Sequence, residues 1–199
     1  MSATITPRKP FRRVAVYCGS SNKVDPVYLE TARAVGEELA RRGVTIVYGG
    51  GRAGLMGQVA DGALSQGGEV VGVITEKLMG LEVGHMGLTE LFVTPSMASR
   101  KAMMAQLADA FIALPGGWGT IEELFEVATL SQLNHHLKPV GILNVNQYYN
   151  ALIAFLMHAE QEGFVRPSHA GMIKVARELP ALLSLLEAAE IPRFGSWAP

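Results

Sequence analysis

Residues 14–21 read Val14-Ala15-Val16-Tyr17-Cys18-Gly19-Ser20-Ser21, five apolar residues that stop at a glycine and two serines. A strand that is apolar on both faces is typical of a parallel sheet covered by helices on both sides. Asp25-Pro26 follows shortly and predicts a helix, with Asp25 as the N-cap and Pro26 in the first position. The opening of the chain therefore predicts an α/β fold.

The same alternation continues along the chain. Apolar runs predict further strands at residues 44–48, 70–74, 88–94, 110–114 and 139–143. Helical patterns fall between them at residues 55–65, 96–107 and 120–135, and residues from 148 onward look mostly helical. This order predicts a single doubly wound, Rossmann-like α/β domain, with helices on both faces of one parallel sheet. We expect a core over residues 12–165, a flexible segment over 1–11 and a helical C-terminal segment over 166–199.

The composition excludes several classes of protein. The chain has 199 residues, with 17 Lys+Arg against 18 Asp+Glu, a formal net charge of −1, and only one cysteine. A near-neutral chain is not built to hold nucleic acid through its phosphates, and one cysteine cannot form a disulfide framework. No apolar run approaches the ~18 residues of a membrane span, and no signal peptide is visible. We expect a cytoplasmic protein with neither a nucleic-acid partner nor a membrane partner.

Ligands of doubly wound sheets bind beyond the carboxyl ends of the strands, where glycine-rich loops are found here. The loop at residues 49–57 contains a G-x-G-x-x-G pattern at Gly49, Gly51 and Gly54. A dinucleotide site also needs an acidic residue at the end of the next strand, but Glu69 only begins that strand. Phosphate contact of another kind and a plain tight turn both stay open. The phosphate-contact candidates near these turns are Gly19, Ser20, Gly50 and Gly51.

A second glycine loop reads Pro115-Gly116-Gly117-Trp118-Gly119-Thr120 and leads directly into a helix. Glycines expose backbone N–H groups, and the helix behind them adds the positive end of its dipole. Together these form an anion site that needs neither lysine nor arginine, and Thr120 can add a hydroxyl. The alternative is an ordinary helix entry at which glycine is required by a positive φ.

Three glutamates follow in the helix, and an arginine stands out in the helix before it. Four apolar residues at helical spacing predict the buried stripe of the later helix: Ile121, Leu124, Phe125 and Ala128. Glu122, Glu123 and Glu126 lie off that stripe. Acidic residues in a first turn complement the dipole, but three in five positions exceed what capping requires. A glutamate held there should be ionised at neutral pH, and could oppose a developing positive charge or accept a proton from water.

Arg100 falls in the middle of the apolar face of the 96–107 helix, with Lys101 at its edge. It either snorkels or holds a carboxylate or phosphate, and its place near the carboxyl end of a strand favours the second. Five methionines nearby fit either the core or an apolar slot for a hydrocarbon group: Met79, Met86, Met97, Met103 and Met104. Cys18 is expected in the core, and no histidines have metal-ligand spacing, so we expect no metal.

Three segments resemble the LONELY GUY (LOG) family of cytokinin riboside 5′-monophosphate phosphoribohydrolases, whose members were long mislabelled lysine decarboxylases. They are residues 50–57, Ser99-Arg100-Lys101 and residues 115–123, and the likeness runs from about Arg13 to Val165. The resemblance implies cleavage of a nucleoside 5′-monophosphate to free base and ribose 5-phosphate by a homodimer or larger homo-oligomer, without a cofactor. It implies Arg100 and Glu123 as the catalytic pair. It also implies a wider set of nucleotide-binding residues: Glu82, Arg100, Lys101, Gly116, Gly117, Trp118, Gly119, Thr120, Glu122 and Thr129.

Three other functions remain as alternatives on the same scaffold. Molybdenum-cofactor carriers have a similar fold and similar glycine loops, but a carrier has no need of both Arg100 and Glu123. An NAD-dependent oxidoreductase is disfavoured by the missing acidic residue for the ribose. A lysine decarboxylase is disfavoured by the size of the chain and the absence of a recognisable lysine context for pyridoxal phosphate.

Overall fold

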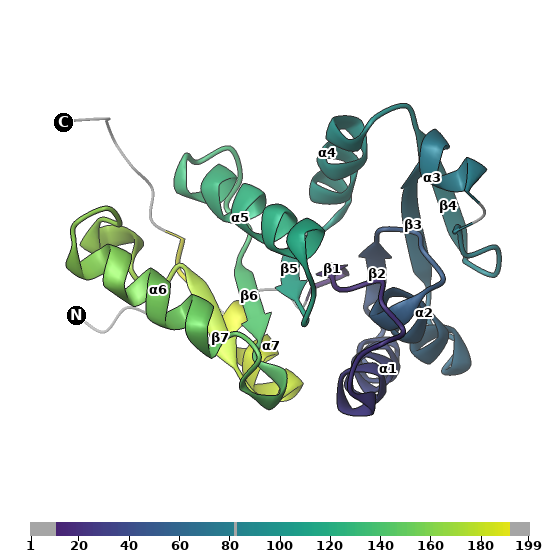
Figure 1. Ribbon diagram of the computed structural model, residues 1–199, viewed down its shortest axis with the longest axis horizontal. Helices are drawn as coiled ribbons and strands as arrows, with labels where there is room; N and C mark the ends of the chain where they lie inside the picture. Colours follow the sequence, from purple (N-terminus) through teal and green to yellow (C-terminus); the bar gives the residue numbers. More distant parts are fainter. Residues whose placement is uncertain (1–10, 82, 192–199) are drawn as a thin grey trace, which may run out of the picture.

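A computed structural model describes residues 11–81 and 83–191, which form one seven-stranded sheet in the order β4-β3-β2-β1-β5-β6-β7 (Figure 1). All six neighbouring pairs are parallel. The strands are β1 (Arg13–Tyr17), β2 (Thr45–Tyr48), β3 (Val70–Thr75), β4 (Glu90–Thr94), β5 (Ala110–Ala113), β6 (Val140–Leu143) and β7 (Ile173–Ala176). The predicted doubly wound α/β fold is confirmed. The strand order reverses between β1 and β5, where Tyr17 lies opposite Ala113.

The helices cover both faces of the sheet. They are α1 (Pro26–Arg41), α2 (Gly54–Ser65), α3 (Glu76–Gly80), α4 (Met97–Leu107), α5 (Trp118–Gln132), α6 (Asn150–Gln161) and α7 (Leu179–Glu187). Residues of α1, α2 and α7 pack into one apolar cluster with the strands, and residues of α4, α5 and α6 pack into another on the opposite face. Figure 1 shows α4 and α5 above the sheet, with α1 and α2 below it. Among the described residues, no helix is long and apolar enough to cross a membrane.

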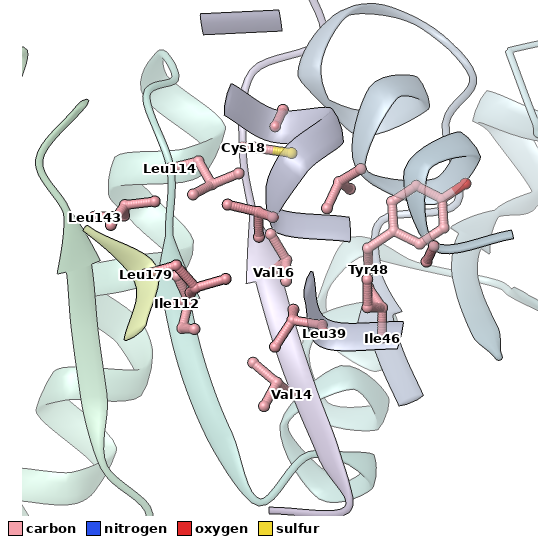
Figure 2. Close-up of a cluster of buried hydrophobic side chains, with 14 of the residues drawn as sticks. Val14, Val16, Cys18, Leu39, Ile46, Tyr48, Ile112, Leu114, Leu143 and Leu179 are labelled. Atoms are coloured by element: carbon pink, nitrogen blue, oxygen red, sulfur yellow. The ribbon is translucent and has the colours of Figure 1, made fainter. Parts of the chain in front are cut away.

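The face covered by α1 and α2 is closely packed and apolar. Figure 2 shows its central layer, in which Val14 and Val16 of β1 meet Leu39 of α1 and Ile112 of β5. Asp25 starts α1 by accepting a hydrogen bond from the Val27 N–H at 3.0 Å, as the sequence predicts for an N-cap. Burial of these side chains is the main stabilising contribution on this face.

The prediction for the C-terminal part of the chain is partly wrong. Residues 166–199 were expected to be helical, but residues Ile173–Ala176 form β7 at the edge of the sheet, paired with β6. The strand has only four residues, includes Lys174 and is only half-buried, so it lacks the continuous apolar run that marks the central strands. The expected flexible segment at 1–11 falls, except for Phe11, outside the described residues.

Candidate functional site

The candidate site lies at the carboxyl edge of the sheet, where β1 and β5 end and the strand order reverses. Doubly wound sheets bind ligands at this point, because the loops after the two central strands diverge to opposite faces. The loop after β5 leads into α5, and Glu123 lies in the first turns of that helix. Arg100 comes from the neighbouring helix α4, which follows β4 at the edge of the sheet.

Arg100 is buried, with 6% of its surface exposed, and its guanidinium group joins three separate elements. Its Nε donates to the Val73 carbonyl at 2.8 Å, and its Nη2 donates to the Gly49 carbonyl at 3.2 Å. Its Nη1 donates to Glu123 Oε1 at 3.2 Å, which forms a buried ion pair. A buried charge is tolerated only when it is paired and hydrogen-bonded, and Arg100 meets both conditions. Arg100 therefore holds a carboxylate and does not snorkel.

Glu123 faces inward on α5, which corrects the prediction that it lies off the buried face. Glu123 is buried together with Leu124 and Val127, whereas Ile121 and Phe125 are only half-buried. The spacing of apolar residues predicted the wrong buried face for α5, because a charged residue, Glu123, occupies one of the inward positions and pairs there with Arg100. The buried face of α5 therefore contains polar as well as apolar side chains.

Burial raises the pKa of Glu123 to about 7, although the nearby Arg100 charge acts to lower it. Glu122 and Glu126 also act to raise the Glu123 pKa, whereas Lys101 lowers it. The expectation of a fully ionised glutamate at neutral pH is therefore wrong, because loss of water around the carboxylate outweighs the opposite charge. A carboxyl group with a pKa near 7 can exchange a proton at the working pH of most enzymes.

The first glycine loop is shaped around Arg100. A Cβ atom at Gly49 would lie 1.9 Å from Arg100 Nη2, so only glycine leaves room for the guanidinium group there. Gly54 has φ +60°, and a Cβ on it would lie 2.4 Å from the backbone of Ser20. The Gly54 N–H is already bound to Asn22 Oδ1 at 2.7 Å. These close approaches account for Gly49 and Gly54, two of the three glycines of the G-x-G-x-x-G pattern, without a dinucleotide.

Three hydrogen bonds to carbonyl groups of the loop fix the second glycine loop in place. Tyr149 Oη donates to the Leu114 carbonyl at 2.7 Å, and Tyr148 Oη donates to the Gly116 carbonyl at 2.8 Å. The Gly19 N–H donates to the Pro115 carbonyl at 3.0 Å. These bonds fix the loop at the start of α5, whose N-cap Gly117 has no side-chain cap bond. Tyr148 and Tyr149 are not among the site residues predicted from the sequence; two adjacent tyrosines a few residues after β6 were the available signal.

Gly116 and Thr120 pack directly against each other in this loop. A Cβ on Gly116 would lie 2.1 Å from Thr120 Oγ1 and 2.8 Å from the Gly19 nitrogen. Thr120 is 4% exposed, so its hydroxyl is enclosed at the loop. The structure therefore brings Gly19, Gly116 and Thr120 together, so the loops after β1 and β5 form one continuous surface at the edge of the sheet.

The remaining predicted residues are scattered around this centre. Lys101 bridges from α4 to two α5 carboxylates, contacting Glu122 and lying 3.1 Å from Glu126 Oε2. Trp118, the first residue of α5, is 91% exposed. Thr129 lines a groove between α5 and α6, in a different place from the Arg100–Glu123 pair. Glu82 lies outside the described residues.

The methionines do not form one slot. Met104 is fully buried in the core, whereas Met86 is exposed on the loop after α3. Met97 is 45% exposed, and its Sδ lies 3.8 Å from Arg100 Nη1, so it borders the site. Cys18 is a free, buried thiol whose pKa is raised by burial, which keeps it neutral. No three His, Cys, Asp or Glu residues within 11–81 and 83–191 are grouped in a way that could hold a metal ion.

Comparison with known proteins identifies the family of the chain. A family model described as "Possible lysine decarboxylase" matches residues 56–186. A probable cytokinin riboside 5′-monophosphate phosphoribohydrolase of Oryza sativa subsp. japonica is 49% identical over 177 residues, covering 89% of this chain and 78% of that protein. A cytokinin riboside 5′-monophosphate phosphoribohydrolase of Rhodococcoides fascians is 44% identical over 178 residues, covering 89% of this chain and 90% of that protein.

Solved structures share the fold at lower identity. The molybdenum cofactor binding protein of Rippkaea orientalis has a TM-score of 0.67 and 22% identity, covering 92% of this chain and 98% of that one. The molybdenum cofactor carrier protein of Chlamydomonas reinhardtii has a TM-score of 0.68 and 22% identity, covering 90% and 97%. At this identity the likeness extends to the fold alone. The relatives at 44–49% identity and the match of the family model show more: the chain belongs to the cytokinin riboside 5′-monophosphate phosphoribohydrolase (LOG) family.

Proposed function

We propose that this protein is a hydrolase that cleaves the N-glycosidic bond of nucleoside 5′-monophosphates, cytokinin nucleotides among them, releasing the free base and ribose 5-phosphate. The observation that carries the proposal is the buried Arg100–Glu123 pair at the carboxyl edge of the sheet, beside the loop that opens α5. The relatives at 44–49% identity are phosphoribohydrolases by name, which supports the same reaction.

Glu123 carries the chemical step in this proposal. Cleavage of an N-ribosyl bond passes through an oxocarbenium-like state, and a nearby carboxylate stabilises the positive charge that develops on the sugar. The same carboxylate can orient the attacking water. Because its pKa is about 7, Glu123 can also take up the proton that this water loses.

Arg100 orients Glu123 in this proposal. All three of its donor nitrogens already have partners, namely the Val73 carbonyl, the Gly49 carbonyl and Glu123. A guanidinium group fixed in this way holds the carboxylate in one place and opposes its full protonation. Preorganisation of this kind lowers the cost of reaching the transition state.

The 5′-phosphate is assigned to the start of α5. Its N-cap Gly117 provides no side-chain cap, and the loop before it is held from behind by Tyr148 and Tyr149. The N–H groups of this first helical turn suit an anion, and their dipole adds to the attraction. Lys101 adds a cation at the rim, where it is already in contact with Glu122. The nucleotide-binding set is Lys101, Gly116, Gly117, Trp118, Gly119, Thr120 and Glu122.

We also propose a homo-oligomer, with the site close to the contact between subunits. Helix α6 is rich in apolar residues, yet none of its residues is buried. Phe155 and Met157 on this helix are 60% and 58% exposed, and Phe164 just after it is 88% exposed. Exposed apolar patches of this kind are typical of surfaces that are covered in an assembly. We assign the protein to the cytoplasm, where a single free thiol stays reduced.

The test is product analysis on a panel of nucleoside 5′-monophosphates, with and without an N6-prenyl group. We expect equal amounts of free base and ribose 5-phosphate from at least one of them. If the phosphate anchors the substrate, the matching nucleoside should release no free base. Glu123→Gln should lower the rate by about 10²–10⁴-fold. Glu37→Gln, at a partly exposed glutamate on α1, should leave the rate unchanged. Absence of ribose 5-phosphate from the whole panel would overturn the proposal, and co-purification of a pterin would favour a carrier instead.

A further inference from the structure

Tyr17 is the last residue of β1, at the point where the strand order reverses. It pairs with Ala113 across the sheet and is only 3% exposed. Its ring is stacked on Phe111, with the ring centroids 6.1 Å apart and the planes 5° from parallel. The ring is therefore held in one orientation by the strand below it and by an aromatic neighbour.

The neighbours of Tyr17 place it under the Arg100–Glu123 pair. It belongs to the same buried cluster as Met104 of α4 and Leu124 of α5, and β1 is packed against both helices. Met104 is one helical turn after Arg100, and Leu124 follows Glu123 directly. Val73, whose carbonyl accepts a hydrogen bond from Arg100, lies in this cluster as well.

The hydroxyl of Tyr17 is the part of this side chain that packing does not account for. Tyr148 and Tyr149 donate their hydroxyls to loop carbonyls, but the Tyr17 hydroxyl has no hydrogen bond to any other described residue. Unlike the Tyr48 hydroxyl, it is not one of the fully enclosed polar atoms without a partner in the described part of the chain, so water can reach it at this edge of the sheet. Burial, and next the negative charge of Glu123, raise the pKa of Tyr17 well above its usual value, so the phenol keeps its proton.

We propose that Tyr17 is a positioning residue for Glu123, and that its hydroxyl donates a hydrogen bond to the Glu123 carboxylate through one bridging water. Arg100 holds one carboxylate oxygen from α4, and Tyr17 supports the group from the strand below. A donor to the ionised form of a carboxyl group lowers its pKa. Tyr17 therefore limits how far burial raises the pKa of Glu123. Its effect on catalysis rests on the proposed function; its effect on the carboxyl group does not.

Several titratable or charged groups face Glu123 from the elements packed around it. Arg100 and Lys101 come from α4, Glu122 and Glu126 from α5 itself, and Tyr17 and Cys18 from the end of β1. Of these, Arg100 and Lys101 lower the pKa of Glu123, whereas Glu122 and Glu126 raise it. All of them except the residue at position 17 are unchanged in a Tyr17→Phe variant, which also keeps the ring that stacks on Phe111.

The first test measures Glu123 directly, by ¹³C NMR titration of the glutamate carboxyl groups, with Glu123→Gln used to assign the signal. We expect Tyr17→Phe to raise the Glu123 pKa from about 7 by about one unit. Tyr48→Phe is the matched control, because Tyr48 ends the adjacent strand β2 and its buried hydroxyl also has no partner among the described residues. An unchanged Glu123 pKa in Tyr17→Phe, or an equal shift in both variants, would overturn the proposal.

The second test reads catalysis against pH. With the Glu123 pKa raised by one unit, kcat/KM of Tyr17→Phe should fall about ninefold at pH 6 and come within about 10% of the wild-type value at pH 9. A merely structural loss would lower the rate equally at both pH values, and that result would contradict the proposal. If the wild-type protein releases no ribose 5-phosphate, the proposed function fails, and the NMR titration still decides the role of Tyr17.

Discussion

The two faces of the sheet use the same strands for different purposes. Below β1, the side chains of α1 and α2 meet Val14 and Val16 in an apolar layer (Figure 2). Above it, α4 and α5 place Arg100 and Glu123 among apolar neighbours such as Met104 and Leu124. A buried ion pair is a costly way to fill a core, because both charges must lose their water. The first face supports the fold, whereas the second gives up stability for a site.

Glycine shows the same division. On the α1–α2 side, a Cβ on Gly36 would lie 2.1 Å from the Val59 carbonyl oxygen, so glycine there lets two helix backbones touch. On the site side, Gly49 and Gly116 make room for polar side chains, Arg100 and Thr120 respectively. Glycine is used in both places, but at Gly36 it allows two helix backbones to touch, whereas at Gly49 and Gly116 it leaves space for the side chains of the site.

The largest effect is expected from breaking the ion pair on the site face. Arg100→Ala leaves the Glu123 carboxyl group buried without its partner and frees the Val73 and Gly49 carbonyls. We expect the free energy of unfolding at pH 8 to fall by about 3–5 kcal/mol, with loss of detectable hydrolysis. Urea denaturation and product analysis measure the two effects.

The matched control replaces both members of the pair. A double variant with Arg100→Leu and Glu123→Leu removes both buried charges, so most of the lost stability should return while activity stays absent. If the double variant is as unstable as Arg100→Ala, the pair contributes to folding as well as to the site, and the contrast between the two faces is weaker than we argue.

A large effect on stability alone is expected on the opposite face. Gly36→Ala should lower the free energy of unfolding by about 3 kcal/mol, because the methyl group collides with backbone and not with a movable side chain. The better helix propensity of alanine offsets only about 1 kcal/mol of this. The folded fraction should keep the wild-type kcat. Gly80→Ala on α3, where a Cβ meets nothing within 4 Å, is the control for propensity; a matching loss there would refute the packing explanation.

The contrast between apolar and polar burial also explains which parts of the fold and of the site could be predicted from the sequence. The five strands in the centre of the sheet are apolar on both faces, and all were predicted within two residues of their ends. The edge strand β4 was predicted equally well, whereas the half-buried edge strand β7 was missed. Arg100 was found because an arginine inside an apolar stripe is anomalous. Glu123 was placed off the buried face for a related reason, since periodicity assigns charged residues to the outside. Contacts between distant segments, such as Arg100 with Gly49 and Val73, leave no local pattern.

A moderate, pH-dependent effect is expected from Glu123→Gln. The wild-type carboxyl has a pKa of about 7 in the folded state against an ordinary 4.5, so the folded state holds its proton more tightly than the unfolded state does. The stability this provides is fully present below pH 4.5 and is lost as pH rises through 7. Glutamine does not titrate. The free energy of unfolding of the variant should therefore gain about 2 kcal/mol relative to wild type between pH 5 and pH 8. A difference that does not vary with pH would show that Glu123 is ionised throughout.

The smallest effect on stability is expected from two ion pairs near the surface, one on each face of the sheet. Substrate binding should still differ between variants of the two pairs. Lys101 pairs with Glu122 and Glu126 at the rim of the site, and Arg33 pairs with Glu37 on α1 at 3.3 Å. Lys101→Met and Arg33→Met should each change the free energy of unfolding by less than about 1 kcal/mol, because the paired carboxylates are partly exposed to water, with 30–53% of each side chain accessible. Only Lys101→Met should raise KM, by about tenfold, since it removes the cation assigned to the nucleotide. Equal KM values for the two variants would mean that the amides at the start of α5 bind the phosphate without help from Lys101.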